Sequence, residues 1–217
     1  MKFSVTAVIV NYKTPDLTEK AVKSLFRFYP EIPIFVIDNE ADSDSASYFK
    51  KLQNEIPTLN YFPQEKNWHH GPGMDLGVKA SKTDWILVFD SDCEILKPEL
   101  LENMFSLIDS DVVYMVGQKD TVDENGKDLR KGEPGIGYIH PKCALVRKSI
   151  YLQLQSFEIH GAPCLKNENE AVSKGFQLVG FPVRDYVFHL GRGTVNRFGY
   201  RLGWWGRVKS YFKQRGI

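Results

Sequence analysis

Short apolar runs alternate with amphipathic stretches along the first half of the chain. Continuous apolar runs of about strand length occupy residues 5–10, 34–37, 59–62 and 85–89. Runs of this kind, bounded by polar residues, are typical of strands that are buried on both faces. Between them, apolar residues recur at helical spacing, as at Leu17, Ala21, Val22 and Leu25. The alternation predicts right-handed βαβ units and an α/β fold with a mainly parallel sheet.

The pattern loosens after residue 98, where the predicted elements are less regular. Helices are expected over residues 98–108 and 167–174, and the second of them ends at Gly175. Further strands are expected over residues 112–116, 144–146 and 187–190. Residues 120–137 are rich in Gly, Asp and Glu, which predicts a long loop of the kind that is usually functional or mobile.

The composition is that of an ordinary globular protein, and its informative feature is the distribution of charge. The 217 residues suit one compact domain, here residues 1–190, with a small C-terminal appendage at residues 191–217. The formal net charge is +1, yet residues 191–217 hold seven Lys or Arg and no Asp or Glu. The tail is therefore basic, and the remainder of the chain is acidic.

Cysteine usage and hydropathy point to an intracellular protein. Cys93, Cys143 and Cys164 stand far apart and match neither a zinc-binding spacing nor a disulfide framework. Such cysteines are typical of a reducing compartment. The chain shows no signal-peptide pattern and no apolar stretch of the roughly 20 residues that cross a bilayer. We expect a cytoplasmic location. Peripheral contact with the inner face of a membrane is compatible with it.

Two carboxylates one residue apart, Asp90 and Asp92, end the buried run of residues 85–89. Ligands of open α/β sheets bind outside the carboxyl ends of the strands, and alternate residues of an extended chain point the same way. Both side chains are thus placed to face one cation, and such oxygen ligands suit Mg²⁺ or Mn²⁺ that carries substrate phosphates. The alternative for an isolated Asp-Ser-Asp is a polar strand end followed by a helix cap.

A further polar residue ends a second predicted strand, and a glycine-containing loop lies between the two strand ends. Asp38 follows the run of residues 34–37, and residues 67–77 form a loop that leads into a helix. Glycines let the backbone approach a ligand closely, and a helix N-terminus favours anions. Together with Asp90 and Asp92, these features predict a nucleoside-diphosphate site with a cation.

These motifs resemble those of the family 2 glycosyltransferases. The segments that carry the resemblance are residues 8–12, 37–43, 67–77 and 90–92, followed by Gly175-Phe176, Pro182 and His189. They are similar to the family's first strand, second-strand motif, Asn-x-Gly loop and DxD motif, and to its late order of Gly-aromatic, Pro and His. The resemblance implies the GT-A (Rossmann-like) fold, a three-layer α/β/α sandwich.

The resemblance also implies a metal-dependent, inverting enzyme. Its donor would be a nucleotide-diphosphate sugar, with a UDP-sugar favoured, and its acceptor a hydroxyl of a glycan, lipid-linked or protein-linked molecule. The cofactor would be Mn²⁺ or Mg²⁺. The implied donor-binding positions are Val10, Asn11, Tyr12, Asp38, Asn67, Gly73, Asp75, Asp90, Ser91 and Arg192. The implied metal ligands are Asp92, His189 and Asp90, and a buried structural imidazole is the alternative for His189.

The chain departs from the family pattern on the phosphate side. His69, Met74 and Asp75 stand where the family usually has Gly, often has Arg and usually has Asn. The phosphate contacts of this loop therefore differ from those of the family, and His69 or His70 is a candidate substitute.

A second departure concerns the catalytic base. The family often shows an acidic pair near the start of the helix that ends in Gly-aromatic, and one of its members is the base. This chain reads His-Gly-Ala-Pro-Cys over residues 160–164. The remaining candidates are Glu168, Glu170 and His160, and a surface acid that complements the helix dipole is the alternative for either Glu.

The basic tail interleaves Arg and Lys with Trp, Tyr and Phe over residues 192–215. This pattern suits an anionic membrane interface, and it equally suits stacking on single-stranded nucleic acid. An aromatic helix packed on the sheet with a solvated basic face is the third possibility. The resemblance favours a membrane surface or an acceptor over nucleic acid.

Two competing functions fit parts of the sequence. An apolar strand followed by Asp-x-Asp also begins the haloacid dehalogenase-type phosphatases, although there the motif usually lies on the first strand. Here it follows three predicted strands, and Cys93 comes next. The other alternative is a degenerate protein that binds a nucleotide sugar without transferring it, and the missing acidic pair supports it.

Overall fold

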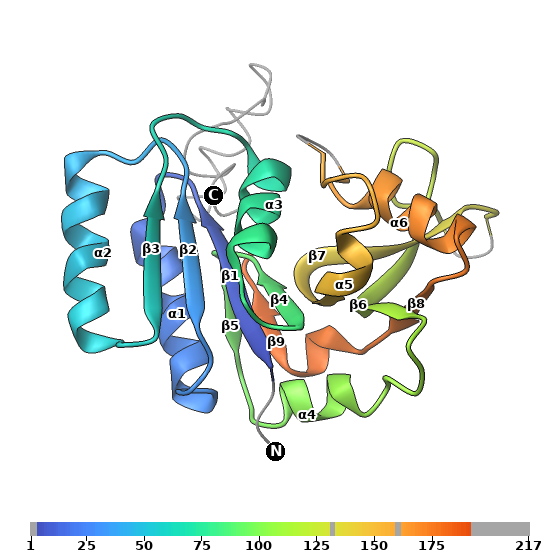
Figure 1. Cartoon of the computed structure of the whole chain (residues 1–217), viewed down its shortest axis with the longest axis horizontal. Helices are drawn as coiled ribbons and strands as arrows, with labels where there is room; N and C mark the ends of the chain where they lie inside the picture. Colours follow the sequence, from blue (N-terminus) through green and yellow to red (C-terminus); the bar gives the residue numbers. More distant parts are fainter. Residues whose placement is uncertain (1–3, 131–132, 159–161, 192–217) are drawn as a thin grey trace, which may run out of the picture.

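Seven strands form one central sheet in the computed structural model, which describes residues 4–130, 133–158 and 162–191. In chain order, the strands are β1 Val5–Asn11, β2 Ile34–Asp38, β3 Leu59–Pro63, β4 Trp85–Phe89, β6 Val113–Val122, β7 Ile136–Arg147 and β8 Gln177–Gly180. Their spatial order is β3-β2-β1-β4-β7-β6-β8 (Figure 1). β7 is antiparallel to both neighbours, and the other pairings are parallel. The predicted mainly parallel sheet is confirmed.

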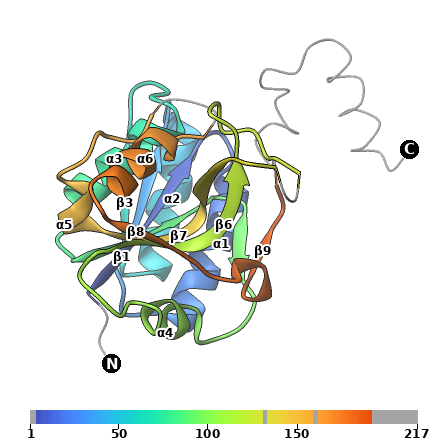
Figure 2. The same cartoon turned by 90° about the vertical axis from the view of Figure 1, so that its right-hand side faces the viewer.

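Helices cover both faces of this sheet and complete three layers. α1 Pro15–Phe28, α2 Ser43–Glu55 and α4 Leu100–Phe105 contribute buried residues to the apolar core on one face. α3 His70–Ala80, α5 Lys148–Tyr151 and α6 Leu165–Ser173 contribute to the core on the other face. In Figure 2, α5 and α6 lie at the upper left and α4 lies at the bottom, with the sheet between them. The predicted three-layer α/β/α sandwich is confirmed.

The two cores meet the sheet through alternate residues of its central strands. In β1, Ala7 and Ile9 belong to the first core, and Val8 and Val10 belong to the second. Successive side chains of a strand point to opposite faces, so a strand covered on both sides must be apolar throughout. Every residue of β1 and β4 is buried, which explains why continuous apolar runs predict them correctly.

Two helix starts follow from the local sequence. α1 begins at Pro15, whose fixed φ suits the first helical turn. α2 begins after Asp42, whose side chain accepts a hydrogen bond from the Ser45 amide at 2.8 Å, while Ser45 Oγ accepts one from the Asp42 amide at 3.1 Å. This capping box satisfies two amides at the helix start and fixes α2 beside the end of β2.

A second, two-stranded sheet returns the end of the described chain to the residues that follow β4. Its strands are β5 Cys93–Ile95 and β9 Val187–His189, which pair antiparallel, and the 3₁₀ turn η1 Val183–Asp185 leads into β9. Ile95 and Val187 are buried in the same core as α1. The small sheet is thereby fixed to the main fold.

The second half of the chain contains more strand than its sequence predicts. The loop predicted over residues 120–137 is wrong at both ends, because β6 continues through Val122 and β7 begins at Ile136. The outer parts of these strands include half-buried and exposed residues, so they lack the continuous apolar run of a covered strand. β5 (Cys-Glu-Ile) and β8 (Gln-Leu-Val-Gly) were not predicted, because polar residues or glycine interrupt their short apolar runs, whereas the equally short β9 lies in an apolar run that was recognised.

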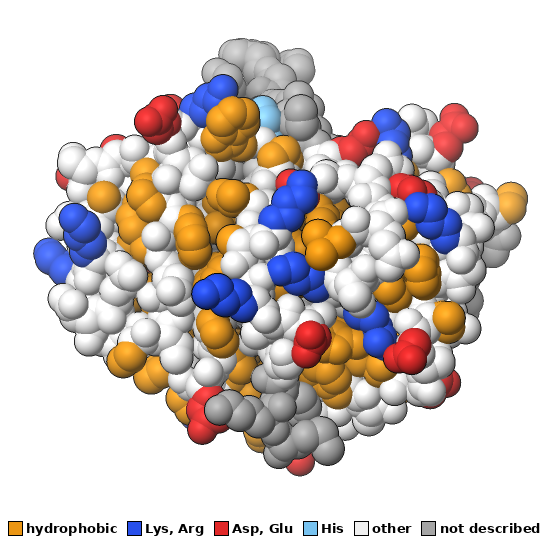
Figure 3. Space-filling view, in the orientation of Figure 1, with side chains coloured by type: hydrophobic (Ala, Val, Ile, Leu, Met, Phe, Trp, Pro, Cys, Tyr) orange, Lys and Arg blue, Asp and Glu red, His pale blue; other side chains and the backbone are white. Residues whose placement is uncertain are grey.

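The surface over β2 and β3 is partly apolar. Figure 3 shows apolar side chains over these strands on the face where α3 covers only the neighbouring part of the sheet. The pair Phe35 and Phe62, with ring centroids 4.8 Å apart, is partly buried against the core of this face. In the ranges that the structure describes, no helix is long and apolar enough to span a bilayer.

Glycines on one side of α3 allow this helix to lie close against β1. A Cβ atom added to Gly77 would lie 2.3 Å from Val8 Cγ1 and 2.9 Å from Val8 Cγ2. A Cβ added to Gly73, one turn earlier, would lie 2.9 Å from Val10 Cγ1. Both valines are buried and β-branched, so neither side chain can swing away. The position of α3 above the sheet depends on these two glycines.

We predict that Gly77→Ala destabilises the protein by about 1–3 kcal/mol, the usual cost of overpacking, although alanine is the better helix former. The measurement is the free energy of unfolding in urea. Gly180→Ala is the control, because the nearest atom to its added Cβ is Lys119 Cβ at 3.5 Å. Adding Val8→Ala should recover part of the loss in a double-mutant cycle. A Gly77→Ala variant as stable as the original protein would contradict the predicted close contact.

Candidate functional site

Polar side chains at the carboxyl ends of β1, β2 and β4 meet at one edge of the central sheet. Asn11 and Asp38 are paired across β1 and β2, and Asp90 directly follows β4. These three strands are parallel, so their carboxyl ends lie together, at the top of Figure 1 where α3 begins. Of the residues expected to bind a donor, the structure thus brings these three to the same edge.

Asn11 and Asp38 are the centre of a buried hydrogen-bond network. Asn11 Nδ2 donates to Asp38 Oδ1 at 2.6 Å, and Asn11 Oδ1 accepts from Thr18 Oγ1 at 2.8 Å. Asp38 Oδ2 accepts from Ser45 Oγ at 2.8 Å and from the Tyr61 hydroxyl at 2.7 Å. Asn11 and Asp38 are 0% and 1% exposed, so the network holds the Asp38 carboxylate in one position.

Two tight turns form the rim above this network. Lys13 Nζ lies 3.4 Å from Glu40 Oε1 and 5.2 Å from the centroid of the Tyr12 ring. Lys13 and Glu40 both have left-handed backbone, with φ of 55° and 57°. Val10 is buried beneath the rim and Tyr12 is half-buried within it. An aromatic ring in this position is suited to stacking on a nucleobase.

Two carboxylates and two imidazoles gather where β4 ends. His189 Nε2 lies 3.1 Å from Asp92 Oδ1 and 3.7 Å from Asp90 Oδ2. His70 Nε2, at the start of α3, lies 3.4 Å from Asp90 Oδ1. Ser91 lies in the turn between the two aspartates. The predicted metal ligands Asp90, Asp92 and His189 are therefore neighbours in space, because β9 folds back onto β5.

The electrostatics of this cluster favour a cation. The Asp90 side chain is 22% exposed, but its Oδ1 atom is buried and has no hydrogen-bond partner among the described residues. Burial raises the pKa of Asp90, and the nearby His70 acts in the opposite direction. The hydrogen bond to Asp92 raises the pKa of His189 against its desolvation. A cation among these groups would relieve the cost of a buried carboxylate.

The donor set fits a divalent metal. Asp92, Cys93 and His189 each offer a ligand atom, and these atoms lie within 4.8 Å of one another. The Cys93 thiol donates to the backbone carbonyl of Lys142 at 3.4 Å, and burial raises its pKa well above the usual range. A protonated thiol is a poor ligand, so the carboxylate oxygens and the imidazole nitrogen are the suitable donors. Oxygen with nitrogen suits Mn²⁺ or Mg²⁺ better than a thiolate-seeking metal.

A pocket of about 280 Å³ opens beside this cluster. It is lined by His189 together with two cationic and two apolar residues: Lys142, Arg184, Val183 and Val187. Lys142 belongs to β7 and Arg184 to η1, so two distant segments contribute the positive charge. The site thus has acidic groups on one side of His189 and basic groups on the other.

The loop before α3 has structural roles at several positions that were expected to bind a donor. Asn67 Oδ1 accepts from the His69 amide at 2.8 Å, in a turn that precedes the helix. Gly73 packs against Val10. Asp75 Oδ1 accepts from the Tyr151 hydroxyl at 2.6 Å, and its Oδ2 lies 2.8 Å from Lys79 Nζ. These contacts connect the loop and α3 to their neighbours.

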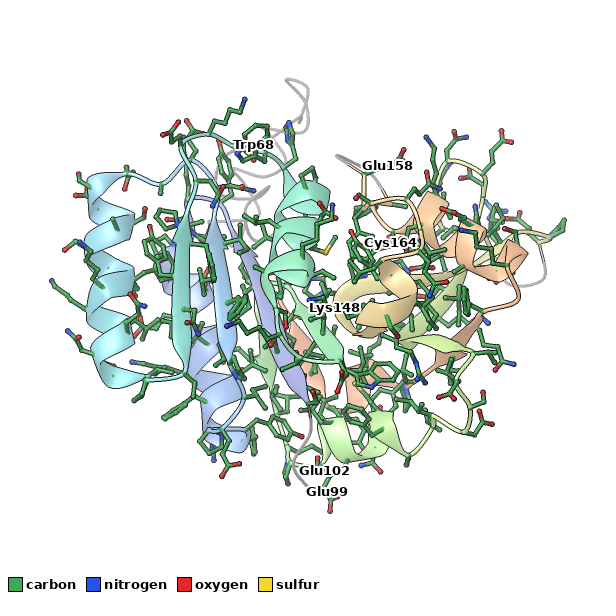
Figure 4. The ribbon with its side chains drawn as sticks, viewed as in Figure 1. Trp68, Glu99, Glu102, Lys148, Glu158 and Cys164 are labelled. Carbon is green, nitrogen blue, oxygen red and sulfur yellow. The ribbon has the colours of Figure 1, made fainter. Side chains whose placement is uncertain are left out.

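The tip of this loop projects outward at the edge where the site lies. Figure 4 shows Trp68 above the start of α3, whereas Glu99 and Glu102 mark the opposite end of the molecule. Trp68 is 48% exposed, and Lys66 Nζ lies 3.8 Å from the centroid of its ring. Gly71 leaves room for the backbone of Glu158, because an added Cβ would lie 1.4 Å from the Glu158 carbonyl oxygen. An exposed aromatic residue therefore borders the site.

Glu168, a predicted base, is sealed inside the protein. Its side chain is 0% exposed, and its Oε2 atom accepts from the Ile139 amide at 2.8 Å. Its Oε1 atom is buried without a hydrogen-bond partner among the described residues. Burial raises the pKa of Glu168 well above its usual value. This geometry gives Glu168 a role in holding β7 and no access to an acceptor hydroxyl.

Of the other two predicted bases, the structure describes Glu170 but not His160. Glu170 lies 2.6 Å from Lys174 Nζ and accepts from the Gln155 amide at 2.7 Å, so the structure does not bring it to the strand-end cluster. His160 and the predicted donor contact Arg192 lie outside the described residues. The same is true of the basic tail after residue 191, whose predicted packing or membrane contact stays a prediction.

Sequence reasoning missed several residues that shape the site. Ser45 and Tyr61 complete the Asp38 network, and Lys142 and Arg184 line the pocket. Ser45 had a detectable signal, because an Asp-x-x-Ser pattern before a helix indicates a capping box. For the other three, nothing in the local pattern indicates a role.

Comparison with known sequences gives a consistent family relationship. The sequence model of glycosyl transferase family 2 matches residues 6–155. An uncharacterized glycosyltransferase of Mycoplasma genitalium, MG060, is 27% identical over 223 residues, which cover 94% of this chain and 71% of the relative. The succinoglycan biosynthesis protein ExoO of Rhizobium meliloti is 20% identical over 224 residues, which cover 89% of this chain and 62% of the relative.

Solved structures share the fold at low sequence identity. The mannosyltransferase PcManGT of Pyrobaculum calidifontis, in complex with GDP-Man and Mn²⁺, superposes with a TM-score of 0.71 at 13% identity. That match covers 100% of this chain and 65% of the other. GalNAc-T7 with UDP, GalNAc and Mn²⁺ gives a TM-score of 0.67 at 14% identity, covering 86% of this chain and 44% of the other. The chain spans less than two thirds of either structure.

We predict that Glu168→Gln stabilises the protein increasingly as the pH rises above about 4.5. The raised pKa of the folded state means that the unfolded chain releases the Glu168 proton first, so the original protein loses stability as the pH rises toward the folded pKa. The substituted amide has no proton to lose and can still accept from Ile139. The measurement is the difference in unfolding free energy between variant and original protein across pH 4–8.

Glu170→Gln is the matched control for this prediction. Its hydrogen bond with Lys174 lowers the pKa of Glu170, so Glu170 contributes stability at neutral pH that disappears as the pH falls. The Glu170→Gln difference should therefore have the opposite sign and shrink toward acid. A Glu168→Gln difference that stays flat from pH 4 to pH 8 would contradict the buried carboxyl.

Proposed function

The chain belongs to glycosyl transferase family 2, and from this membership we propose that it transfers a sugar from a nucleoside-diphosphate sugar to a hydroxyl group with the help of a divalent cation. The single observation that carries the proposal is the cluster at the end of β4. There Asp92 Oδ1 and His189 Nε2 are 3.1 Å apart, with Asp90 beside them. Carboxylate and imidazole donors that converge next to a partly buried carboxylate are suited to a cation that carries phosphates.

The family relationship makes the chain a glycosyltransferase and removes one alternative. Haloacid dehalogenase-type phosphatases begin with their Asp-x-Asp on the first strand, whereas Asp90 and Asp92 follow β4 in a sheet whose order is β3-β2-β1-β4-β7-β6-β8. The phosphatase alternative is therefore wrong.

We propose that Asp92 and His189 hold Mn²⁺ or Mg²⁺, with Asp90 as a further ligand or a partner of a metal-bound water. When bound, the cation supplies charge neutralisation for the leaving diphosphate. The protein's own contribution is to fix its ligands. Asp92 O accepts from the Leu190 amide at 3.0 Å, and Cys93 pairs with His189 across β5 and β9. This pairing sets the distance between the carboxylate and the imidazole before any ligand arrives.

The nucleoside end of the donor fits the edge formed by β1 and β2. The Asn11–Asp38 network is rigid and buried below Tyr12, which offers an aromatic surface. We propose a uridine nucleotide first, although PcManGT was solved with GDP-Man and GalNAc-T7 with UDP. The acceptor is proposed as a hydroxyl of a glycan, a lipid-linked or a protein-linked molecule.

We propose transfer with inversion, which needs a base beside the acceptor hydroxyl. The burial of Glu168 argues against that role for it, and Glu170 is paired with Lys174. We therefore propose His160 as the base, with Glu170 as the alternative. The anomeric configuration of the product, followed by NMR from the start of the reaction, tests the stereochemistry, and a retained configuration contradicts inversion.

A second candidate function is nucleotide-sugar binding without transfer. The observation that favours it is the position of the family's acidic pair, where Pro163 and Cys164 are both buried and Cys164 is the N-cap of α6. Binding of donor without hydrolysis or transfer across a panel of acceptors would establish this function in place of the first.

We predict that Asp92→Ala and His189→Ala each abolish the thermal stabilisation that Mn²⁺ gives together with UDP or GDP. A ligand present at 100 times its Kd stabilises the folded state by about 2.7 kcal/mol, so the effect is readily measured as a shift in Tm. Donor hydrolysis or transfer should fall at least about 100-fold, the scale of losing one contact to the developing charge.

Asp111→Ala is the matched control for these variants. The exposed Asp111 carboxylate lies 3.3 Å from Arg147 Nη1, and Arg147 pairs with Trp85 at the opposite end of β4, so its loss should leave the Mn²⁺-dependent shift unchanged. Asp92→Ala protein that keeps the full Mn²⁺-dependent shift would remove Asp92 from the metal site.

A further inference from the structure

Two cationic side chains converge on the pocket beside His189. Lys142 and Arg184 line it together with Val183 and Val187, and its volume is about 280 Å³. In the ranges that the structure describes, neither cation forms a salt bridge within 4.0 Å. Asp120 and Asp90 act on Lys142 only from beyond salt-bridge distance, so the convergence of two cations in one concave site favours a further anionic partner.

The backbone of Lys142 is fixed to the cluster at the end of β4. Its carbonyl oxygen accepts from the Asp90 amide at 2.9 Å and from the Cys93 thiol at 3.4 Å. The register of β6 against β7 shifts here: Gly117 pairs with Ala144, whereas Lys119 pairs with Ile139. The extra residues of β7 bulge out of the regular ladder, and such bulges redirect side chains near functional sites.

Arg184 is held from a different element. It lies in η1, and its Nε atom donates to Gln118 Oε1 at 3.2 Å. Gln118 Nε2 in turn donates to Asp120 Oδ2 at 2.6 Å. Gln118 is the residue of β6 that lies opposite the β7 bulge. The bulge therefore positions Lys142 directly and orients Arg184 through Gln118. Among the described residues, no side-chain hydrogen bond engages the guanidinium nitrogens beyond Nε, so their donors can serve another partner.

Lys142 and Arg184 bring two like charges to one pocket, and the Coulomb repulsion from Arg184 adds to the cost of burying the half-buried Lys142 ammonium group. An anion between the two side chains would remove this repulsion and use both sets of donors. The arrangement has the character of an anion site that is complete before its ligand arrives.

We propose that Lys142 and Arg184 form a phosphate-binding subsite that adjoins the metal-ligating residues. Arg presents a planar fork and Lys a compact point charge, and both are suited to phosphate oxygens. His189 borders the subsite and the metal ligands alike. A phosphate could come from the diphosphate of the donor or from a phosphate carried by the acceptor. The donor diphosphate as the source rests on the proposed function, whereas the match between two cationic side chains and a phosphate does not.

The test is calorimetric titration of the full chain with five probes: Mn²⁺ alone, inorganic pyrophosphate, UMP, UDP with Mn²⁺, and a short-chain prenyl phosphate. Lys142→Met and Arg184→Met should weaken binding of the phosphate that occupies the subsite by about 10-fold or more, equivalent to about 1.4 kcal/mol. Lys142→Arg should restore most of the affinity. Lys97→Met is the matched control, since Lys97 Nζ lies 4.1 Å from the centroid of the Tyr186 ring and does not line the pocket.

Mn²⁺ alone separates a binding role from a structural one. Removing a positive charge near the metal ligands should leave Mn²⁺ affinity unchanged or raise it, whereas a distorted site would lose affinity for Mn²⁺ and phosphate together. Weakened UDP binding with unchanged binding of UMP, titrated alongside, assigns the subsite to the donor diphosphate. Weakened prenyl phosphate binding with unchanged UDP binding assigns it to the acceptor.

Two results would overturn the subsite. One is that both Met variants bind every phosphate probe within twofold of the original protein, or that the original protein binds none of them. The other is a parallel loss of Mn²⁺ and phosphate affinity in Lys142→Met. Pyrophosphate binding that depends on Lys142, in a protein that binds no nucleotide, would keep the subsite and reject the proposed glycosyl donor.

Discussion

The antiparallel pairing of β7 with β4 is the constraint on which the rest of the site depends. Phe89 pairs with Cys143, and one residue further the Asp90 amide donates to the Lys142 carbonyl at 2.9 Å. Asp90, which follows β4, and Lys142, which belongs to β7, therefore lie next to each other where the pairing of the two strands ends. β9 then adds His189 by pairing with β5 directly after Asp92. A slip of one residue in β7 would turn Lys142 to the other face of the sheet, because strand side chains alternate.

The two halves of the site are built on opposite electrostatic principles. The Asp38 carboxylate accepts hydrogen bonds from Asn11, Ser45 and Tyr61, so its charge is satisfied within the protein. Asp90, by contrast, has a buried oxygen that makes no hydrogen bond among the described residues, with His70 Nε2 at 3.4 Å as its neighbour, and burial raises the pKa of Asp90. A carboxylate whose hydrogen bonds are all made within the protein is suited to positioning a neutral part of a ligand. A carboxylate with an oxygen that makes no hydrogen bond is suited to binding a positive charge. The first half is therefore complete within the protein, whereas the second leaves hydrogen-bonding capacity for a ligand.

The sequence reveals the functional side chains that lie at the end of a strand buried on both faces. Asp38, Asp90 and Asp92 could be predicted because an apolar run marks each strand and the sheet places its carboxyl ends together. His189 could be predicted as a possible ligand, but its contact with Asp92 depends on the pairing of three-residue strands, which no local pattern encodes. Lys142 was not predicted, because a bulge breaks the periodicity that assigns side chains to faces.

The burial of Glu168 shows why a helix start is a weak guide to a catalytic base. α6 begins after Cys164, and its first turn places Glu168 toward β7, where the carboxyl accepts from the Ile139 amide. Ile139 is the last residue of β7 paired with β6 before the bulge that carries Lys142. The carboxyl therefore holds the bulge in place by occupying an amide that the shifted ladder leaves free. At these two positions α6 therefore serves the structure: Glu168 holds β7, and Glu170 forms an ion pair with Lys174.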